Sequence, residues 1–118
     1  MQGLQLTADL RDCTASLPLL ADADGLAALC RRAVAEAGLT AVAELFHRYP
    51  GEGGITGVVL LAESHLAVHT WPEIASATLD VYVCNRGRDN SGRAEALLEA
   101  LVAAFEPASA TRQSLRRG

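Results

Sequence analysis

Residues 57–84 read GVVLLAESHLAVHTWPEIASATLDVYVC, and this stretch decides the fold class. Residues 57–62 form a short apolar run, which is typical of a buried strand. Residues 65–70 and 77–84 alternate between apolar and polar side chains, which predicts strands with one buried face. Strands that follow one another through short connections pair in an antiparallel sheet.

Two further strands are predicted before this stretch. Residues 4–10 alternate loosely between apolar and polar side chains. Residues 40–49 also favour a strand, and we expect Val42, Leu45 and Phe46 to face inward there.

Two amphipathic helices complete the prediction. Residues 25–37 place Leu26, Leu29 and Val34 on one face, and Gly38 is a good stop. A second apolar stripe follows a capping Ser91. The order is therefore β-α-β-β-β-β-α. We expect an α/β (α+β) fold, a two-layer sandwich whose antiparallel sheet is covered on one face by two helices.

The length of 118 residues favours one domain. We assign residues 1–106 to it and expect residues 107–118, rich in Ser, Ala and Arg, to be a disordered tail. A domain of this size has a modest core, so association with a second copy would stabilise it.

The net charge of −4, with no basic cluster before the last residues, argues against nucleic acid as the main partner. We also expect no membrane association, because no apolar run has the length of a bilayer span and no signal peptide is visible. The three cysteines are widely spaced and odd in number, which favours a reducing, cytoplasmic location.

Few residues in the central stretch are candidates for chemistry. Glu63-Ser64 lies between two predicted strands, where an ordinary turn is the simplest interpretation. His65 and His69 share a strand face about 13 Å apart, too far to chelate one ion, so we predict no metal site. Cys84 ends its strand on the polar face. It is either a small half-buried residue with no chemical role, or a thiol that acts as an acid or a nucleophile.

A hydrolase triad of Ser64, His69 and an acid such as Glu73 or Asp80 is a weak alternative, because no Gly-x-Ser-x-Gly surrounds Ser64.

The string AESHLAVHTWPE over residues 62–73, followed by LDVYVC over residues 79–84, closely resembles the small bacterial and archaeal S-adenosylmethionine decarboxylases. The likeness extends more loosely over residues 4–105 and thins in the tail. These family members are self-cleaving proenzymes that act in spermidine and polyamine biosynthesis.

The resemblance implies a cleavage between Glu63 and Ser64, giving a β chain of residues 1–63 and an α chain of residues 64–118. The Ser64 hydroxyl attacks the Glu63 carbonyl, and elimination then leaves a pyruvoyl group in place of Ser64. That cofactor forms a Schiff base with the substrate amine. His69 matches the histidine that assists processing, and Thr56 stands where the family usually has a Ser hydroxyl.

The resemblance also implies roles in turnover. Cys84 matches the proton donor. Tyr49 aligns with an aromatic that stacks on adenine, His69 would lie on its other face, and Glu73 matches the carboxylate that binds the ribose. The implied partners are a small-molecule substrate, S-adenosyl-L-methionine, and a second copy of the chain, because family enzymes are homodimers with active sites at the interface.

The sequence departs from the family pattern in places that leave other activities open. Arg11-Asp12 replaces an aromatic-Gly pair, and Asn85-Arg86 follows Cys84 where Gly is common. One alternative is a pyruvoyl-dependent L-ornithine or L-arginine decarboxylase of the same family. The other is an unprocessed, non-catalytic homologue that binds a nucleoside or a partner subunit.

Overall fold

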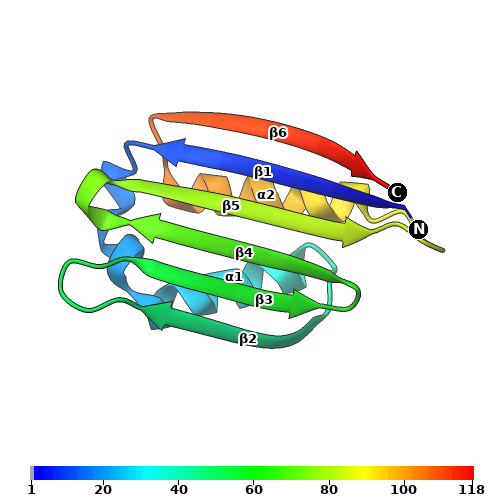
Figure 1. Cartoon of the computed structure of the whole chain (residues 1–118), viewed down its shortest axis with the longest axis horizontal. Helices are drawn as coiled ribbons and strands as arrows, with labels where there is room; N and C mark the ends of the chain where they lie inside the picture. Colours follow the sequence, from blue (N-terminus) through cyan, green and yellow to red (C-terminus); the bar gives the residue numbers. More distant parts are fainter. Residues whose placement is uncertain (1) are drawn as a thin grey trace.

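The computed structural model describes residues 2–118 and has two layers, a sheet and a pair of helices (Figure 1). The strands are β1 Gly3–Arg11, β2 Ala41–Arg48, β3 Ile55–Leu61, β4 Ser64–Trp71, β5 Ser76–Cys84 and β6 Ser109–Arg117. The helices are α1 Ala23–Glu36 and α2 Ser91–Phe105, with short 3₁₀ segments η1 Thr14–Ala21 and η2 Pro72–Ile74. This architecture confirms the expected two-layer α+β sandwich. In the described residues, neither helix has the length and apolar character of a bilayer span.

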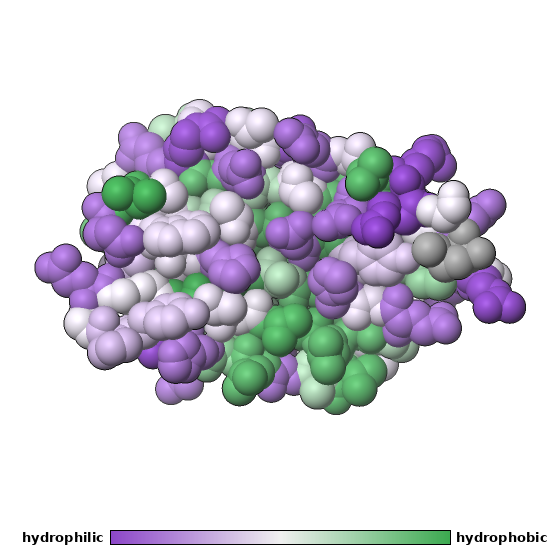
Figure 2. Space-filling model, viewed as in Figure 1, coloured by the Kyte–Doolittle hydropathy of each residue, from purple (hydrophilic) through white to green (hydrophobic). Residues whose placement is uncertain are grey.

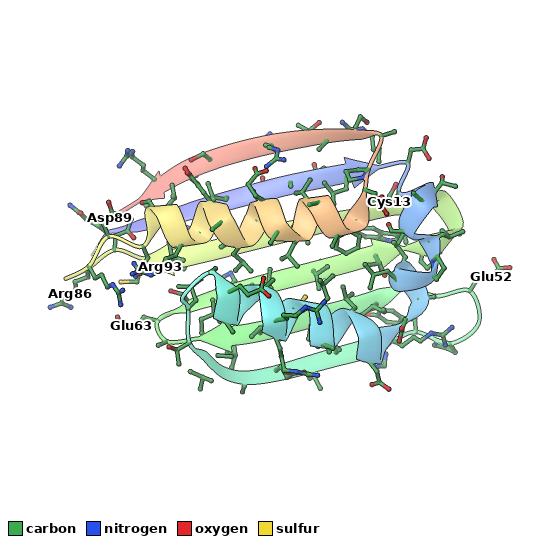
Figure 3. The ribbon with its side chains drawn as sticks, turned by 180° about the vertical axis from the view of Figure 1, so that it is seen from behind. Cys13, Glu52, Glu63, Arg86, Asp89 and Arg93 are labelled. Carbon is green, nitrogen blue, oxygen red and sulfur yellow. The ribbon has the colours of Figure 1, made fainter. Side chains whose placement is uncertain are left out.

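The sheet has the order β2-β3-β4-β5-β1-β6, and every neighbouring pair is antiparallel. Both helices pack on one face, which Figure 3 shows from behind the view of Figure 1. The strand residues that face the helices are buried, as in Leu66 and Val68 of β4 and Leu79, Val81 and Val83 of β5. The opposite face, which no described helix covers, is called the open face below.

The boundaries of α1 follow from ordinary capping chemistry, whereas the expected cap Ser91 is the first residue of α2, and Asn90 before it makes no side-chain cap hydrogen bond. Asp22 precedes α1, and its side chain accepts a hydrogen bond from the Gly25 amide at 2.9 Å, which satisfies one free donor of the first turn. After α1 the chain turns at Gly38, whose φ of 82° suits a residue without a Cβ. The predicted Asp cap and the Gly stop are therefore both present.

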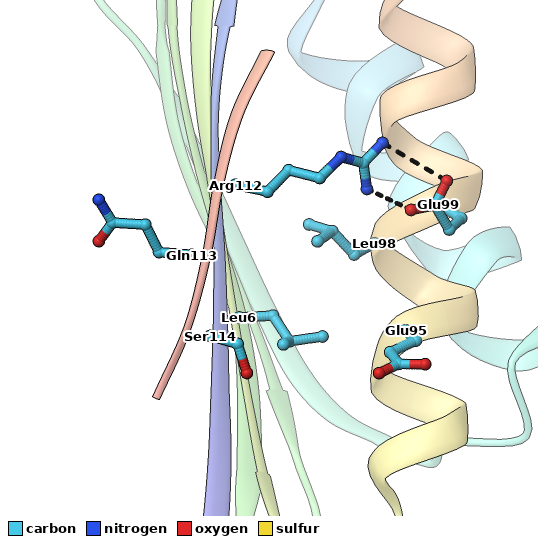
Figure 4. Close-up of a pocket in the computed structure, with 7 residues that line it drawn as sticks. All are labelled: Leu6, Glu95, Leu98, Glu99, Arg112, Gln113 and Ser114. Atoms are coloured by element: carbon cyan, nitrogen blue, oxygen red, sulfur yellow. Dashed lines mark hydrogen bonds and ion pairs between the residues drawn. The ribbon is translucent and has the colours of Figure 1, made fainter. Parts of the chain in front are cut away.

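The prediction of a disordered tail at residues 107–118 is wrong. Residues 109–117 form β6 and pair with the whole of β1, from Gly3↔Arg117 to Arg11↔Ser109. Arg112 also forms an ion pair with Glu99 of α2, across a small pocket lined by Leu6 and Leu98 (Figure 4). All nine side chains of β6 are exposed, so its composition resembles that of a tail although its backbone is bound to β1.

The inward placement predicted for Val42 and Leu45 is also wrong. Their exposed fractions are 66% and 71%, whereas Phe46 packs against the core. Because neighbouring strand residues point to opposite faces, Phe46 on the helix side places Leu45 on the open face. A register shift between Ala41 and Ala43 leaves Val42 exposed as well. Figure 2 shows hydrophobic side chains gathered over β2 and β3 on this face.

Candidate active site

The polar residues singled out in the sequence lie at two opposite ends of β4. Glu63, Ser64 and Cys84 lie where β4 begins and β5 ends, a region called the serine end below. The histidine end comprises Tyr49, Thr56, His69, Trp71 and Glu73, where β4 finishes. Each end has its own pocket.

The serine end begins with a tight hairpin. Leu61 of β3 pairs with Ser64 of β4, so Ala62 and Glu63 alone form the connection. Glu63 has a φ of 59°, in the left-handed region that costs a residue with a Cβ about 1 kcal/mol or more. The peptide between Glu63 and Ser64 therefore joins a strained turn residue to the first residue of a paired strand.

Ser64 and Cys84 are 20 positions apart in the sequence and adjacent in space. The Cys84 amide donates a hydrogen bond to Ser64 Oγ at 3.1 Å. Cys84 is half-buried and on the open-face side of β5, opposite in direction to the buried Val83. Its carbonyl oxygen accepts a hydrogen bond from Asn90 Nδ2 at 2.8 Å, which anchors the end of β5.

A pocket of about 350 Å³ lies beside Ser64. Its walls are Gln5, Glu63, Ser64, His65, Tyr82 and Arg117. The rings of His65 and Tyr82 stack with centroids 5.7 Å apart, since the two residues pair directly across β4 and β5. Sequence reasoning missed Gln5, Tyr82 and Arg117. The alternation of β5 already placed Tyr82 on the same face as Cys84, whereas only the pairing of β6 brings Arg117 here.

The histidine end is built on the pairing of β3 with β4, in which Thr56 lies opposite His69. Thr56 Oγ1 is 3.2 Å from His69 Nδ1 and 3.2 Å from the Tyr49 hydroxyl, so the three side chains form a hydrogen-bonded row. The Trp71 ring stacks near His69, with centroids 6.0 Å apart. Glu73 joins these residues around a pocket of about 450 Å³. The structure thus brings together all the residues expected to bind the nucleoside.

The Gly-rich loop between β2 and β3 sets the position of Tyr49. The Tyr49 amide donates to the Gly54 carbonyl at 2.9 Å, which closes the loop. A Cβ at Gly54 would lie 1.8 Å from the Thr70 carbonyl oxygen, so only glycine lets the loop approach β4 this closely. Side chains from β2, β3 and β4 can therefore share one pocket.

The two ends cannot act on each other within one chain. His69 lies five positions after Ser64 along an extended strand, which is about 17 Å at 3.3 Å per residue. This distance rules out a triad of Ser64, His69 and an acid inside one subunit, because a base must lie within hydrogen-bond reach. Within residues 2–118, no group of three His, Cys, Asp or Glu side chains could hold a metal ion.

The other two cysteines have no access to these pockets. Burial raises the pKa of Cys30 to about 12, and the nearby Glu44 carboxylate adds to the effect. Burial also raises the pKa of Cys13, with a further contribution from Asp12. The thiols of Cys13 and Cys30 therefore stay protonated at neutral pH. Of the three cysteines, Cys84 is half-exposed and the other two are buried.

Comparison with known proteins identifies the family of this chain. The family model described as S-adenosylmethionine decarboxylase matches residues 4–118. A curated S-adenosylmethionine decarboxylase proenzyme of Picrophilus torridus is 32% identical, over 98% of this chain and 84% of that protein. One of Acidithiobacillus ferrooxidans is 34% identical, over 98% of this chain and 82% of that protein.

The solved structures include a close neighbour. The crystal structure of the adenosylmethionine decarboxylase from Aquifex aeolicus superposes with a TM-score of 0.85 and 31% identity. The superposition covers 98% of this chain and 90% of that one. The chain therefore belongs to the S-adenosylmethionine decarboxylase family.

Proposed function

We propose that this chain is a proenzyme that cleaves itself between Glu63 and Ser64 and then decarboxylates S-adenosyl-L-methionine for spermidine and polyamine synthesis. The observation that carries the proposal is the serine end itself. Glu63, with its strained backbone, and Ser64 line one pocket, and the Cys84 amide donates a hydrogen bond to the Ser64 hydroxyl beside it. In cleavage, Ser64 Oγ attacks the Glu63 carbonyl carbon, the peptide C–N bond breaks, and an ester replaces it.

The residues around Ser64 fit the pyruvoyl group that such a cleavage produces. Ser64 starts its strand beside an open pocket, and the Cys84 amide already donates to its side chain. A pyruvoyl group here would supply an electron sink for the electron pair that departing carbon dioxide leaves on the substrate carbon. The Cys84 side chain, whose own backbone amide bonds Ser64 Oγ, then delivers a proton to the substrate carbon.

Substrate binding is assigned to the histidine end. Tyr49, His69 and Trp71 offer aromatic rings to an adenine, and Glu73 offers a carboxylate to ribose hydroxyls and to a positively charged sulfonium group. His69, held by Thr56, is also the proposed base for elimination, and the Thr56 hydroxyl is the proposed donor to the oxyanion formed in cleavage.

Because the two ends are about 17 Å apart, we propose that each active site is shared by two copies of the chain. A two-fold axis between two open faces, running across the strands, reverses the direction of β4. Ser64 of one copy then meets His69 of the partner subunit. An apolar patch lies between the two ends on β2 and β3 and suits such an interface. It consists of the exposed Leu45 and Leu60 and the half-buried Val58, which pairs with Leu45.

The sheet order would hold the two fragments together after the proposed cleavage. The β chain would contribute β1, α1, β2 and β3, and the α chain would contribute the rest. β1 lies between β5 and β6, so one fragment inserts a strand between two strands of the other. The β3–β4 ladder also joins the two fragments, so separating them would require breaking three ladders.

The intact mass of the purified protein tests the proposal. We expect two fragments that end and begin at residues 63 and 64, and a single chain of about 12.4 kDa in the variant Ser64→Ala. An uncleaved native chain contradicts the proposal and favours a non-catalytic binding protein. Carbon dioxide release from S-adenosylmethionine, L-ornithine and L-arginine then identifies the substrate, and activity on ornithine or arginine alone favours that alternative.

A further inference from the structure

A guanidinium reaches the serine end from the far end of the chain. Among the described residues around the pocket at Ser64, Arg117 of β6 alone carries this group. Its Nη1 donates to Gln5 Oε1 at 2.8 Å, and its central carbon lies 5.9 Å from the centroid of the Tyr82 ring. These contacts hold the side chain across β1, against the pocket that contains Glu63 and Ser64.

Neighbouring residues set this position. Gln5 Nε2 donates to Asp80 Oδ1 at 3.2 Å, which turns the Gln5 carbonyl oxygen toward Arg117. A Cβ on Gly3 would lie 2.5 Å from the Tyr82 hydroxyl, so the glycine makes room for the ring to lean over β1. Arg117 pairs with Gly3, whereas Arg116 pairs with Leu4 and points to the helix side.

The proposed cleavage produces an anion in this pocket. After the ester has formed, a base removes the proton from Ser64 Cα, and the electron pair forms the Cα=Cβ double bond. The Cβ–Oγ bond breaks, and its electrons leave with the Glu63 α-carboxylate. Negative charge therefore grows on Glu63, which lines the same pocket as the guanidinium of Arg117.

We propose that Arg117 is a catalytic residue of self-cleavage, which binds the Glu63 α-carboxylate as it leaves. A guanidinium matches a carboxylate in charge and in its two-pronged geometry. Stabilising a charge that develops in the transition state accelerates the step. The inference rests on the proposed function, and it gives the exposed strand β6 a chemical role besides pairing with β1.

The rate of maturation of freshly synthesised full-length chain tests the inference. We expect Arg117→Ala to cleave about tenfold more slowly than the native chain, Arg117→Lys to cleave at an intermediate rate, and Arg116→Ala to match the native rate. Hydroxylamine, which cleaves esters directly, should restore fast cleavage in Arg117→Ala, because that variant accumulates the ester. Thermal unfolding of the uncleaved background Ser64→Ala, with and without each Arg change, gives the stability control.

Three results overturn the inference. They are cleavage of Arg117→Ala at the native rate, slow cleavage that hydroxylamine does not accelerate, and equal slowing by Arg116→Ala. Native-rate cleavage of Arg117→Ala overturns the inference even if the matured variant has a raised KM. A raised KM would mean that the guanidinium binds the substrate and has no role in cleavage. A native chain that never cleaves rejects the proposed function instead, so the two failures are distinguishable.

Discussion

The serine end and the histidine end lie at opposite ends of β4 and are built differently. The serine end depends on a strained two-residue turn and on chain segments from both termini, because Gln5 and Arg117 line its pocket. The histidine end depends on one hydrogen-bonded row from β2, β3 and β4, supported by a Gly-rich loop. In the proposed function, the serine end holds the bond to be broken, and the histidine end supplies a base and an aromatic pocket. Neither end by itself would then be a complete active site.

Complementation between two inactive variants tests whether the ends combine across a dimer. We expect Cys84→Ala alone to lower turnover by about a hundredfold or more and His69→Ala to block maturation. Co-expressed, the two variants form mixed dimers in which one of two sites has both native residues. If the two variants pair at random, about half of the dimers are mixed, so about a quarter of all sites, and of native activity, is restored. Activity no higher than that of either single variant contradicts the shared site.

Charging the apolar patch between the ends should separate the subunits. Leu45 is 71% exposed on the open face, so Leu45→Asp leaves the monomer's core intact while burying a charge in any face-to-face dimer. We expect a dimer-to-monomer change in light scattering and loss of maturation. Leu17→Asp, at an exposed leucine of η1 outside the patch, is the matched control. A Leu45→Asp protein that stays dimeric places the interface elsewhere.

A smaller change at the histidine end should affect maturation more than substrate binding. Thr56→Val keeps the shape of the side chain but removes the hydroxyl that bonds both Tyr49 and His69. We expect cleavage to slow by about tenfold, the value of one or two hydrogen bonds, in a time course of fragment formation. Thr78→Val, on the strand beside His69, is a control without a described bond to the row. Equal slowing in both variants assigns the effect to packing.

The smallest expected effect concerns the thiols. Cys13 and Cys30 have raised pKa values, so fewer of their thiols are ionised at pH 8 than in a free cysteine. Both residues are also buried, which keeps a reagent away from them. A thiol reagent at pH 8 should therefore modify Cys84 first, and a nucleoside bound from the histidine end of the partner subunit should slow that reaction. Peptide mass mapping locates the label. Early labelling of Cys30 contradicts the assignment.

The local pattern of the sequence was sufficient for most of the fold. Alternation over residues 65–70 and 77–84 identified the strands, and Asp22 and Gly38 marked the limits of α1, because these signals depend on neighbours in the chain. The same reasoning failed for β6 and for Leu45. A fully exposed edge strand has no alternation to detect, and the side of the sheet that a leucine faces depends on pairing.

For the candidate site, the sequence by itself determined which residue types are present: a serine after a glutamate, two histidines of one strand face, and a cysteine at a strand end. Tertiary structure alone decided their distances. Antiparallel pairing of β4 with β5 brought Cys84 to Ser64, and the same extended geometry put His69 about 17 Å away. Pairing of the last strand with the first added Arg117 to the serine end. The physical reason is that a strand fixes the direction of each side chain locally, whereas its neighbours across the sheet are set by chain segments far away in sequence.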